Sequence, residues 1–541
     1  MRYDALIIGG GHNGLTCACY LAGAGLKVRV LERRDIVGGA AVTEEFHPGF
    51  RNSTASYTVS LLNPKVIQDL RLKEHGLKVI LRPLANFLPL SDKDYLKVGG
   101  GLEATQQEFA RFSKKDAERL PAYYESLERV ADVLRDLILQ TPPNAGGGVG
   151  ELMKVLRQSR RFVKLPIEVQ RDVLALFTKS AGQVLEQWFE SEPAQAVFGF
   201  DSIVGNFASP YTPESAYVLL HHVFGEVNGE KGAWGHAIGG MGAITQAMQK
   251  EALARGVEIT TGAEVAEVRV KAGRAVGAAL KDGTEIDADI VVSNLNPKLL
   301  YLKLVDRRHL DPDFLTRIQG WRCGSGTLRM NVALSELPDF TCLPGKQAQV
   351  HHSSGIIMAP SLKYMERAYF DAKRDGFAKE PIVEMLIPST VDDSLAPQGQ
   401  HVASLFCQHF DPEPQNGKTW DEMREAAADT VIDTVNRYAP NFKKSVLGRM
   451  VLTPLDLERR FGLIGGDIFH GALTLDQLFS ARPVLGNAAY RAPIGALYMC
   501  GAGSHPGGGV TGAPGHNAAR EILSDLRWRK LLPWRGHARR G

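Results

Sequence analysis

The pattern of hydrophobic and polar residues near the start of the chain predicts a strand, a helix and a second strand in succession. Residues 5–8 form a short apolar run, which is typical of a buried parallel strand. Apolar residues then recur at helical spacing from 15 to 22, and Gly23 and Gly25 predict the end of that helix. Residues 27–31 form a second apolar run. This succession is typical of the βαβ unit of a parallel sheet.

Three glycines occupy the turn between the first strand and the helix, in the pattern G-x-G-x-x-G. Gly9 permits a tight turn, Gly11 lets a pyrophosphate approach the backbone, and Gly14 lets the helix pack close to the strand. The start of the helix offers free N–H groups and a partial positive charge to phosphates. Glu32, at the tip of the second strand, is placed to accept hydrogen bonds from ribose hydroxyls. The combination predicts a dinucleotide site.

A second pair of glycines follows the second strand. Gly38 and Gly39, with Ala40 after them, predict another close approach of the backbone beside a diphosphate and ribitol. An acid followed shortly by such a pair resembles the extended FAD fingerprint of the amine oxidase and carotenoid desaturase superfamily, which implies FAD as the cofactor. Arg33 either contacts a phosphate or the adenine, or is a solvated surface residue. His12 either touches the pyrophosphate or points to solvent.

The middle of the chain predicts a substrate region that is interrupted by a return to the cofactor domain. Residues 77–100 have the pattern of short strands, and residues 109–139 and 151–200 are mainly helical in pattern. The segment 231–300 holds a glycine-rich turn, a helix and alternating strands, and it looks like the second piece of a split FAD-binding domain. By that resemblance, Val265 places its backbone N–H and C=O against the adenine.

A third glycine-rich segment lies near the end of the chain. A strand at 496–500 leads into GAGSHPGGGVTG, residues 501–512, and a helix is predicted to start near Thr511. The motif is very similar to the C-terminal motif of phytoene desaturases, carotenoid isomerases and retinol saturase-like proteins. Over nearly its whole length the chain resembles the phytoene desaturase-like flavoprotein family of pyridine nucleotide-disulfide oxidoreductase domain-containing protein 2.

This resemblance implies roles for particular residues of the last motif. Gly501, Ala502, Gly509 and Val510 would contact FAD, and His505 would lie near the isoalloxazine as the one named candidate for chemistry. Ala502 stands where amine oxidases usually carry an acid, which counts against an amine substrate. Flavin desaturases need no evident acid–base residue, because hydride can leave to the flavin while the site supplies geometry and a dry, apolar environment.

The predicted fold class is therefore α/β, with a split Rossmann-type FAD-binding domain of the amine oxidase and carotenoid desaturase type and a mixed α+β substrate domain. Six segments are predicted. They are 1–100, 231–300 and 481–526 for the three parts of the FAD-binding domain, 101–230 for a helical substrate or cap region, 301–480 for the substrate domain, and 527–541 for a basic tail.

Composition narrows the classes of function. The 541 residues are enough for two or three domains, and a net charge of +3 is too small to indicate a nucleic-acid partner. No apolar run approaches the roughly 18 residues of a membrane-spanning helix. The first strand begins too early to leave room for a targeting segment, so we expect a cytoplasmic protein.

Few side chains elsewhere are candidates for chemistry. The six cysteines are scattered, with neither C-x-x-C nor metal-ligand spacing, which predicts no metal site and fits a reducing compartment. Cys17 and Cys19 lie two residues apart on a predicted helix, so we interpret them as packing residues. His221 and His222 are adjacent on a helical segment, so at most one of them is expected to face a site.

Two basic stretches of the chain are candidates for contact with a membrane surface. One holds Arg157, Arg160, Arg161 and Lys164 among apolar residues, and the other is the tail from Arg527 onward, with two tryptophans. An ordinary solvated helix face and a solvated tail are the competing interpretations. A homo-oligomer is likewise left open.

The sequence thus predicts a FAD-dependent oxidoreductase that acts on CH–CH bonds of a small lipophilic substrate, such as a polyene, by hydride transfer to or from the flavin. A redox-neutral flavin isomerase and a non-catalytic flavoprotein that regulates a membrane or respiratory partner remain alternatives. A disulfide reductase is disfavoured, because the chain has no C-x-x-C and no clear second G-x-G-x-x-G for a nicotinamide cofactor. The substrate, the electron acceptor and the direction of reaction are not identified.

Overall fold

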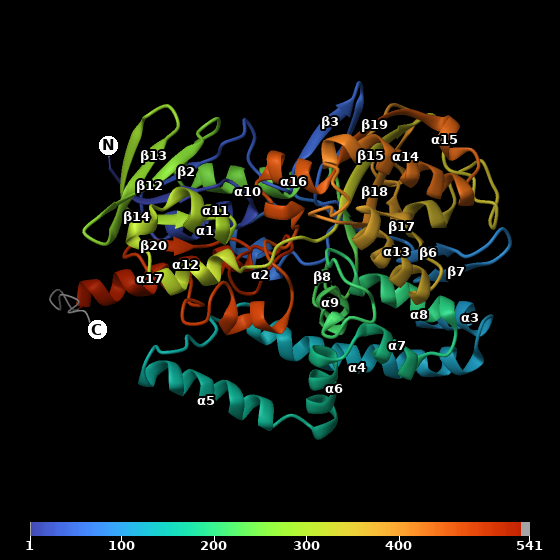
Figure 1. Cartoon of the computed structure of the whole chain (residues 1–541), viewed down its shortest axis with the longest axis horizontal. Helices are drawn as coiled ribbons and strands as arrows, with labels where there is room; N and C mark the ends of the chain where they lie inside the picture. Colours follow the sequence, from blue (N-terminus) through green and yellow to red (C-terminus); the bar gives the residue numbers. More distant parts are fainter. Residues whose placement is uncertain (1, 532–541) are drawn as a thin grey trace.

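One sheet combines strands from three distant parts of the chain. The computed structural model describes residues 2–531. In spatial order, the strands of this sheet are β11 (Glu258–Thr260), β2 (Val28–Leu31), β1 (Arg2–Ile8), β14 (Glu285–Ser293), β13 (Arg274–Leu280) and β12 (Val265–Lys271), with β20 (Leu497–Met499) also paired to β14. The pairs β11–β2, β2–β1, β1–β14 and β14–β20 are parallel, whereas β12 and β13 form an antiparallel extension. The split α/β architecture predicted from the sequence is confirmed (Figure 1).

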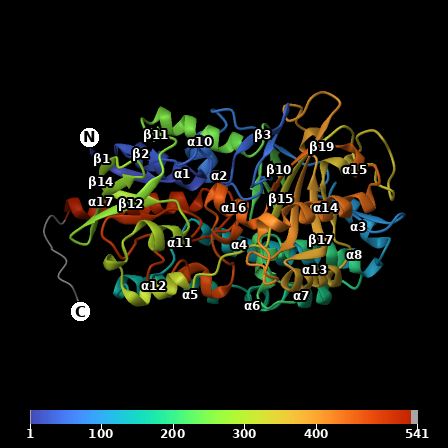
Figure 2. The ribbon, with the colours of Figure 1, turned by 45° about the horizontal axis from the view of Figure 1, so that its top comes forward.

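Three helices pack on one face of this sheet. They are α1 (His12–Gly23), α10 (Gly242–Ala254) and α17 (Ala513–Leu531), and α1 contacts both of the others (Figure 2). Leu15 of α1, Met248 of α10 and Ile522 of α17 share a core with Ile7 and Val30 of the sheet. The helical spacing of these apolar residues therefore serves to cover the parallel strands.

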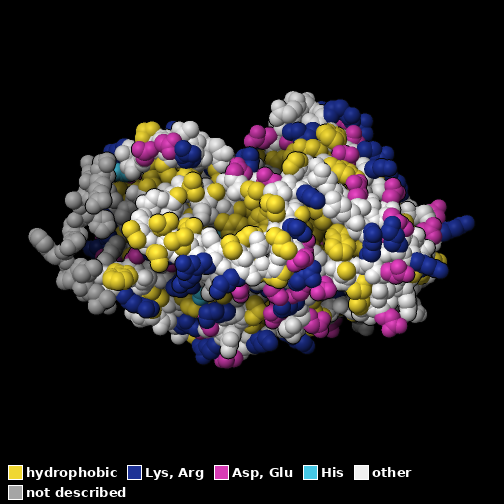
Figure 3. All heavy atoms as spheres, turned by 90° about the horizontal axis from the view of Figure 1, so that it is seen from below, with side chains coloured by type: hydrophobic (Ala, Val, Ile, Leu, Met, Phe, Trp, Pro, Cys, Tyr) yellow, Lys and Arg dark blue, Asp and Glu magenta, His cyan; other side chains and the backbone are white. Residues whose placement is uncertain are grey.

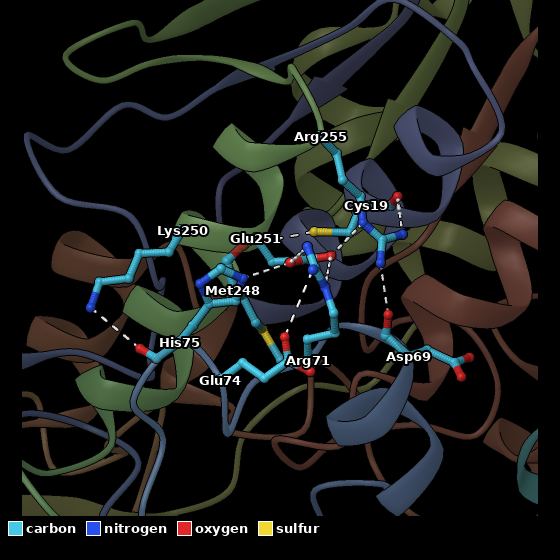
Figure 4. Close-up of polar contacts among 9 residues, drawn as sticks. All are labelled: Cys19, Asp69, Arg71, Glu74, His75, Met248, Lys250, Glu251 and Arg255. Atoms are coloured by element: carbon cyan, nitrogen blue, oxygen red, sulfur yellow. Dashed lines mark hydrogen bonds and ion pairs between the residues drawn. The ribbon is translucent and has the colours of Figure 1, made fainter.

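A buried carboxylate ties α10 to the chain that follows α2 (Pro64–Asp69). Glu251 of α10 is fully buried, and it accepts hydrogen bonds from Arg71 at 2.9 Å and Arg255 at 2.6 Å. His75 Nε2 lies 2.6 Å from the same carboxylate (Figure 4). Burial raises the pKa of Glu251, but the hydrogen bonds from His75, Arg71 and Arg255 outweigh it, so the pKa lies below its ordinary value. This half of the molecule thus depends on an ionised group in its interior.

A second sheet carries the remaining lobe (Figure 1). Its strands, in spatial order, are β19 (Val446–Leu452), β15 (Leu328–Leu334), β18 (His401–Phe410), β17 (Phe377–Leu386), β16 (Gly355–Met358), β6 (Asn86–Pro89) and β7 (Tyr95–Val98). Helices α13 (Leu362–Asp375) and α14 (Trp420–Tyr438) pack against it. β6 and β7 join this sheet although they lie within the segment 1–100 that we assigned to the FAD-binding domain, because β6 pairs with β16.

A group of helices lies below both sheets in Figure 1. They are α3 (Leu102–Ala110), α4 (Lys114–Ile138), α5 (Val149–Val163), α6 (Ile167–Thr178), α7 (Ala181–Trp188), α8 (Glu192–Gly199) and α9 (Ser215–His221). The helical pattern predicted between residues 109 and 139 corresponds mainly to α4, and α3 ends at its start. The hydroxyl of Ser113 accepts a hydrogen bond from the Asp116 N–H, which caps the start of α4 and ends the preceding turn.

Short elements join these units. They are the hairpins β3 (Thr43–His47) with β4 (Phe50–Ser53) and β8 (Glu226–Val227) with β9 (Glu230–Lys231). The strands β5 (Val79–Leu81) and β10 (Gly235–Ala237), which are distant in sequence, form an antiparallel pair. The remaining helices are α11 (Pro297–Leu299), α12 (Pro312–Gln319), α15 (Phe442–Ser445) and α16 (Pro454–Phe461).

Three further predictions concern cysteines, membrane spans and the tail. All six cysteines are free, and five are buried, which confirms that Cys17 and Cys19 pack within the core. Among residues 2–531, no helix is long and apolar enough to cross a membrane. The first residues of the predicted tail continue α17 as far as Leu531, and residues 532–541 lie outside the described part.

Candidate functional site

The glycine-rich segments meet at one large cavity at the end of the parallel strands. The turn after β1, the Gly38–Gly39 pair and the last motif all line it. The N–H of Gly38 donates to the carbonyl oxygen of Gly10 at 2.9 Å, and Gly11 and Gly38 form an isolated parallel bridge. The two glycine segments predicted to approach the same ligand are therefore adjacent in space.

Close packing explains why these positions are glycines. A Cβ atom on Gly14 would lie 2.2 Å from the carbonyl oxygen of Gly9, and one on Gly11 would lie 2.7 Å from Nδ2 of Asn294. Gly38 has φ of +126°, which side chains rarely tolerate, and its Cβ would meet the backbone of Ala41 at 2.7 Å. Side chains at these positions would therefore push apart the segments that surround the cavity.

Glu32 and His12 tie the first turn to its surroundings. Glu32 is buried, and its carboxylate accepts hydrogen bonds from the N–H groups of Gly10 and Arg34, both at 2.9 Å, while it lines the cavity. His12 Nε2 donates to the carbonyl oxygen of Gly509 at 3.1 Å. Burial lowers the pKa of His12 to about 4, so the imidazole is neutral near pH 7. His12 thus does not simply point to solvent: it links the first glycine turn to the last motif.

At the far end of the cavity, Val265 lies at the start of β12, on the strand where the sequence placed an adenine contact. Arg33 also lines the cavity, but its side chain is exposed and donates to the carbonyl oxygen of Arg459 at 3.1 Å. The neighbouring Arg34, which the sequence did not single out, also lines the cavity and forms an ion pair with Glu44 at 2.7 Å.

The last motif contributes Ala502, Gly509 and Val510 to the cavity, whereas Gly501 lies beside it. A Cβ on Gly501 would lie 2.6 Å from the carbonyl oxygen of Asn294, so this glycine serves close backbone packing. Fully buried Arg482 holds the motif in place, because its guanidinium donates to the carbonyl oxygen of Ala502 at 2.8 and 3.0 Å. No sequence signal pointed to Arg482, which stands alone in an irregular loop.

The other part of the cavity is mostly apolar. Its walls come from the helical region, from the second sheet and from loops, and they include Val204, Trp234, Met241, Phe406, Ile468 and Phe469. His222 also faces this part, where its ring lies parallel to that of Trp234 with the centroids 6.0 Å apart. Burial lowers the pKa of His222 to about 4. His221 lines a different cavity, so one member of the pair faces the site, as helical geometry predicts.

The structure does not bring His505 to the large cavity. Its imidazole is buried, its Nε2 lies 3.1 Å from the carbonyl oxygen of Leu137 in α4, and the residue lines two other cavities beside the helical region. Ala502, Gly509 and Val510 line the large cavity, whereas the residues between Ala502 and Gly509 do not. Among the described residues, no group of three potential ligands has the arrangement of a metal site.

The cavity suits FAD in its donors and in its shape. Gly11 precedes α1 without a side-chain cap, so the N–H groups of the first turn remain available to a pyrophosphate. Glu32 keeps acceptor capacity beyond its two backbone bonds, which suits ribose hydroxyls. The glycine backbone provides the close approach that a diphosphate requires, and the apolar part of the cavity lies beyond it.

Comparisons with known proteins point the same way. The family model described as flavin containing amine oxidoreductase matches residues 14–327. Pyridine nucleotide-disulfide oxidoreductase domain-containing protein 2 of Rattus norvegicus is 42% identical, over 97% of this chain and 94% of that protein. The lycopene-forming phytoene desaturase of Pseudescherichia vulneris is 26% identical, over 96% of this chain and 99% of that enzyme.

A solved structure supports the fold. An oxidoreductase from Methanosarcina mazei superposes with a TM-score of 0.61 at 17% identity, and the match covers 97% of this chain and all of that one.

Proposed function

Because the chain belongs to the flavin containing amine oxidoreductase family and is a FAD-dependent oxidoreductase, we propose that it acts on a CH–CH bond of a lipophilic, polyene-like substrate. The observation that carries the proposal is the apolar part of the large cavity, which adjoins the glycine loops expected to hold FAD. The similarity to a phytoene desaturase is a second, weaker support.

The residues of this cavity favour exclusion of water over acid–base catalysis. Phe406 and Phe469 are buried in its wall. His222 is neutral near pH 7, because burial lowers its pKa. The hydroxyl of Tyr57, which also lines the cavity, is committed to Glu384 at 2.5 Å, and the ring of Tyr57 stacks on Phe406 with the centroids 5.2 Å apart. Such walls suit a hydrocarbon better than an ammonium group.

The protein's part in the reaction is to bind, orient and desolvate. The backbone around Gly11 and Gly38 would hold the diphosphate, and Glu32 would hold the ribose. Bound FAD supplies the group that accepts or gives up hydride. The side chains around Val204 and Ile468 hold the substrate against that group and keep water away from the reacting carbons.

The first test is anaerobic. Holoprotein is mixed with phytoene in detergent, and the flavin absorbance is followed while the pigment is analysed by chromatography. Bleaching of the flavin together with a product of longer conjugation supports the proposal. A rearranged product without bleaching indicates a redox-neutral isomerase. If neither phytoene nor other lipophilic polyenes change while FAD is bound and reducible by dithionite, the non-catalytic alternative is favoured.

One variant tests whether the substrate binds in the apolar part of the cavity. Val204→Phe adds volume to the wall at a residue remote in sequence from the glycine loops. We expect the FAD content to be unchanged and the rate with phytoene to fall by about tenfold or more, since a blocked pocket costs roughly 1–3 kcal/mol. An unchanged rate would mean that the substrate does not use this part of the cavity.

We further propose that α5 contacts an anionic membrane surface. Its exposed apolar side chains are Val149, Leu152, Met153, Val155, Leu156, Phe162 and Val163. Exposed basic side chains at Arg157, Arg160 and Lys164 accompany them. Figure 3, which views the molecule from the side of α5, shows apolar side chains interspersed with lysines and arginines. An amphipathic helix of this kind suits the interface of anionic lipid.

Sedimentation with phospholipid vesicles tests this contact. We expect the protein to sediment with vesicles that contain phosphatidylglycerol and to remain in solution with phosphatidylcholine alone. Leu152→Ser should weaken the binding, whereas Phe370→Ser, which changes a side chain of similar exposure on α13, should not. Equal loss in both variants would contradict a specific role for α5.

A further inference from the structure

A second cavity adjoins the large cavity that we expect to hold FAD. It lies between α4, α9 and the last motif, and its apolar walls include Leu134, Ile138, Tyr217 and Phe224. Leu61 lines both cavities, so its side chain lies between them. The helix α9 and its C-cap also separate them, because His222 faces the large cavity and the preceding His221 faces the second one.

Two buried histidines give this second cavity an unusual polarity. His221 and His505 both line it, and only 5% and 3% of their surfaces are exposed. His221 Nε2 and His505 Nδ1 are buried without a hydrogen-bond partner in the described part of the chain. An unpaired polar atom in a buried site carries a free-energy cost, so each such nitrogen calls for an explanation. His505 also lines a further cavity, but this cavity is lined by both histidines, and a ligand with a polar group there would satisfy their nitrogens.

The charge state of these histidines narrows the class of ligand. Burial lowers the pKa of His505 to about 4, and burial lowers the pKa of His221 well below its ordinary range. Both rings are therefore neutral near pH 7 and offer an anion no charge. Arg135 also lines this cavity, but its guanidinium is paired with Glu128 and Asp132.

Hydrogen bonding narrows the class further. His505 Nε2 lies 3.1 Å from the carbonyl oxygen of Leu137, which can only accept, so Nε2 carries the proton. In a neutral imidazole the other nitrogen then has a free lone pair. Nδ1 of His505 is thus an acceptor, and its partner must be a donor. A hydroxyl group satisfies this requirement, whereas an ether or a ketone does not.

We propose that this second cavity binds the hydroxyl-bearing end of an apolar molecule, with His505 Nδ1 accepting the hydrogen bond and His221 in the wall of the same cavity. This inference rests on the proposed function, because it takes the bound molecule to be the substrate. An elongated substrate that passes Leu61 would reach from the second cavity to the large one. His505 then acts in positioning, by setting which carbons lie in the large cavity, and not in the chemistry of the reacting bond.

The test uses three fluorescent probes of one shape with the holoenzyme. Diphenylhexatriene is a hydrocarbon, its hydroxymethyl derivative can donate a hydrogen bond, and its methoxymethyl derivative can only accept one. Binding is followed as the loss of probe emission through energy transfer to bound FAD. We expect the alcohol to bind about five- to tenfold more tightly than either analogue, the gain from one buried hydrogen bond.

Substitutions of the histidines test whether these residues cause the preference for the alcohol. In His505→Phe we expect the preference for the alcohol to disappear while hydrocarbon binding persists, and in His221→Phe we expect it to shrink. His351→Phe is the matched control, because His351 is equally buried with unpartnered ring nitrogens but lines neither cavity. It should keep the full preference. Phe replaces His without opening a large void.

Each outcome either supports or overturns the inference. Equal binding of the alcohol and the methyl ether to the wild-type protein overturns the inference without any variant, and so does a preference that survives in His505→Phe with its FAD retained. The phytoene assay is independent of these probes. If phytoene reacts but no probe preference exists, only this inference fails. If the preference follows His505 but no lipophilic substrate reacts, only the proposed function fails.

Discussion

The two parts of the large cavity are built in different ways. The part assigned to the nucleotide is made mainly of backbone, from Gly9 to Gly14 and at Gly38, and Glu32 is its principal carboxylate. The apolar part is made of side chains such as Phe406 and Phe469, which come from a strand and a loop far apart in the sequence. Backbone sites demand particular residues at fixed spacing, whereas an apolar wall accepts many combinations of side chains.

The largest effect is expected where the backbone itself would be displaced. Gly14→Val places side-chain atoms within 2.2 Å of the Gly9 carbonyl oxygen, so the strand and helix must separate. We expect the purified protein to lose FAD, with an affinity reduced by at least about 100-fold. The ratio of flavin to protein absorbance measures this. Gly150→Ala in α5, where an added Cβ meets nothing within 4 Å, is the control and should keep its FAD.

The next largest effect concerns the core behind the backbone part. Glu251→Gln removes the charge that faces Arg71, His75 and Arg255. We expect the free energy of unfolding to fall by about 3 kcal/mol at pH 7, less than for a fully buried pair because these partners are partly exposed. Urea denaturation measures it. Glu74→Gln, which changes an exposed carboxylate 3.7 Å from Arg71, should cost less than about 1 kcal/mol.

The difference in stability between wild type and Glu251→Gln is also expected to depend on pH. The folded-state pKa of Glu251 is lowered, so the folded state binds fewer protons there than the unfolded state. The stabilisation is fully present above the unfolded pKa of about 4.3 and is lost as the pH falls through the lower folded pKa. The difference between wild type and Glu251→Gln should therefore stay constant from pH 7 to about 5 and shrink below about 4. A difference that grows in acid would contradict this.

A smaller effect is expected at Glu32. Glu32→Gln keeps the shape but replaces a carboxylate that accepts from two N–H groups and is expected to hold the ribose. We expect FAD to bind about 10- to 100-fold more weakly, since hydrogen bonds to charged groups contribute roughly 1.5–3 kcal/mol. Titration of the apoprotein with FAD measures it. Glu264→Gln, at a cavity residue that pairs with Lys281, should change the affinity by less than about threefold.

The smallest effect on FAD is expected from the apolar part. Met241→Leu conserves volume in the wall, and we expect FAD affinity to stay within about twofold and stability within about 1.5 kcal/mol. Thermal unfolding and FAD titration measure both. If this variant loses FAD as Gly14→Val does, the two parts of the cavity are not separable and the comparison fails.

Much of the cofactor half was predictable because local rules govern it. The glycine spacing after β1, the acid at Glu32 and the second pair at Gly38 each follow from a conformational or contact requirement of a few neighbouring residues. The apolar part of the cavity was not predictable. Trp234 and Phe469 carry no signal of their own, and His222 faces the cavity only because α9 is rotated to point it there.

Placement within the last motif shows the same limit. Ala502 and Gly509 line the cavity as expected, but His505 between them turns toward α4. Arg482, which holds the carbonyl of Ala502, lies in a loop with no motif of its own. Neighbours in sequence share a motif, but the direction of each side chain depends on what packs against the loop.

The sequence alone determined the βαβ unit and its dinucleotide-binding turn, because strand and helix periodicity and the glycine turns report requirements that a short stretch of chain must meet by itself. The split of the α/β domain and FAD as the cofactor followed from the resemblance of the glycine motifs to those of a known family. Only the tertiary structure decided which side chains form the apolar cavity, that β6 and β7 belong to the second sheet, and that His221 and His505 share a second cavity. Those are contacts between residues tens to hundreds of positions apart, and no local pattern encodes them.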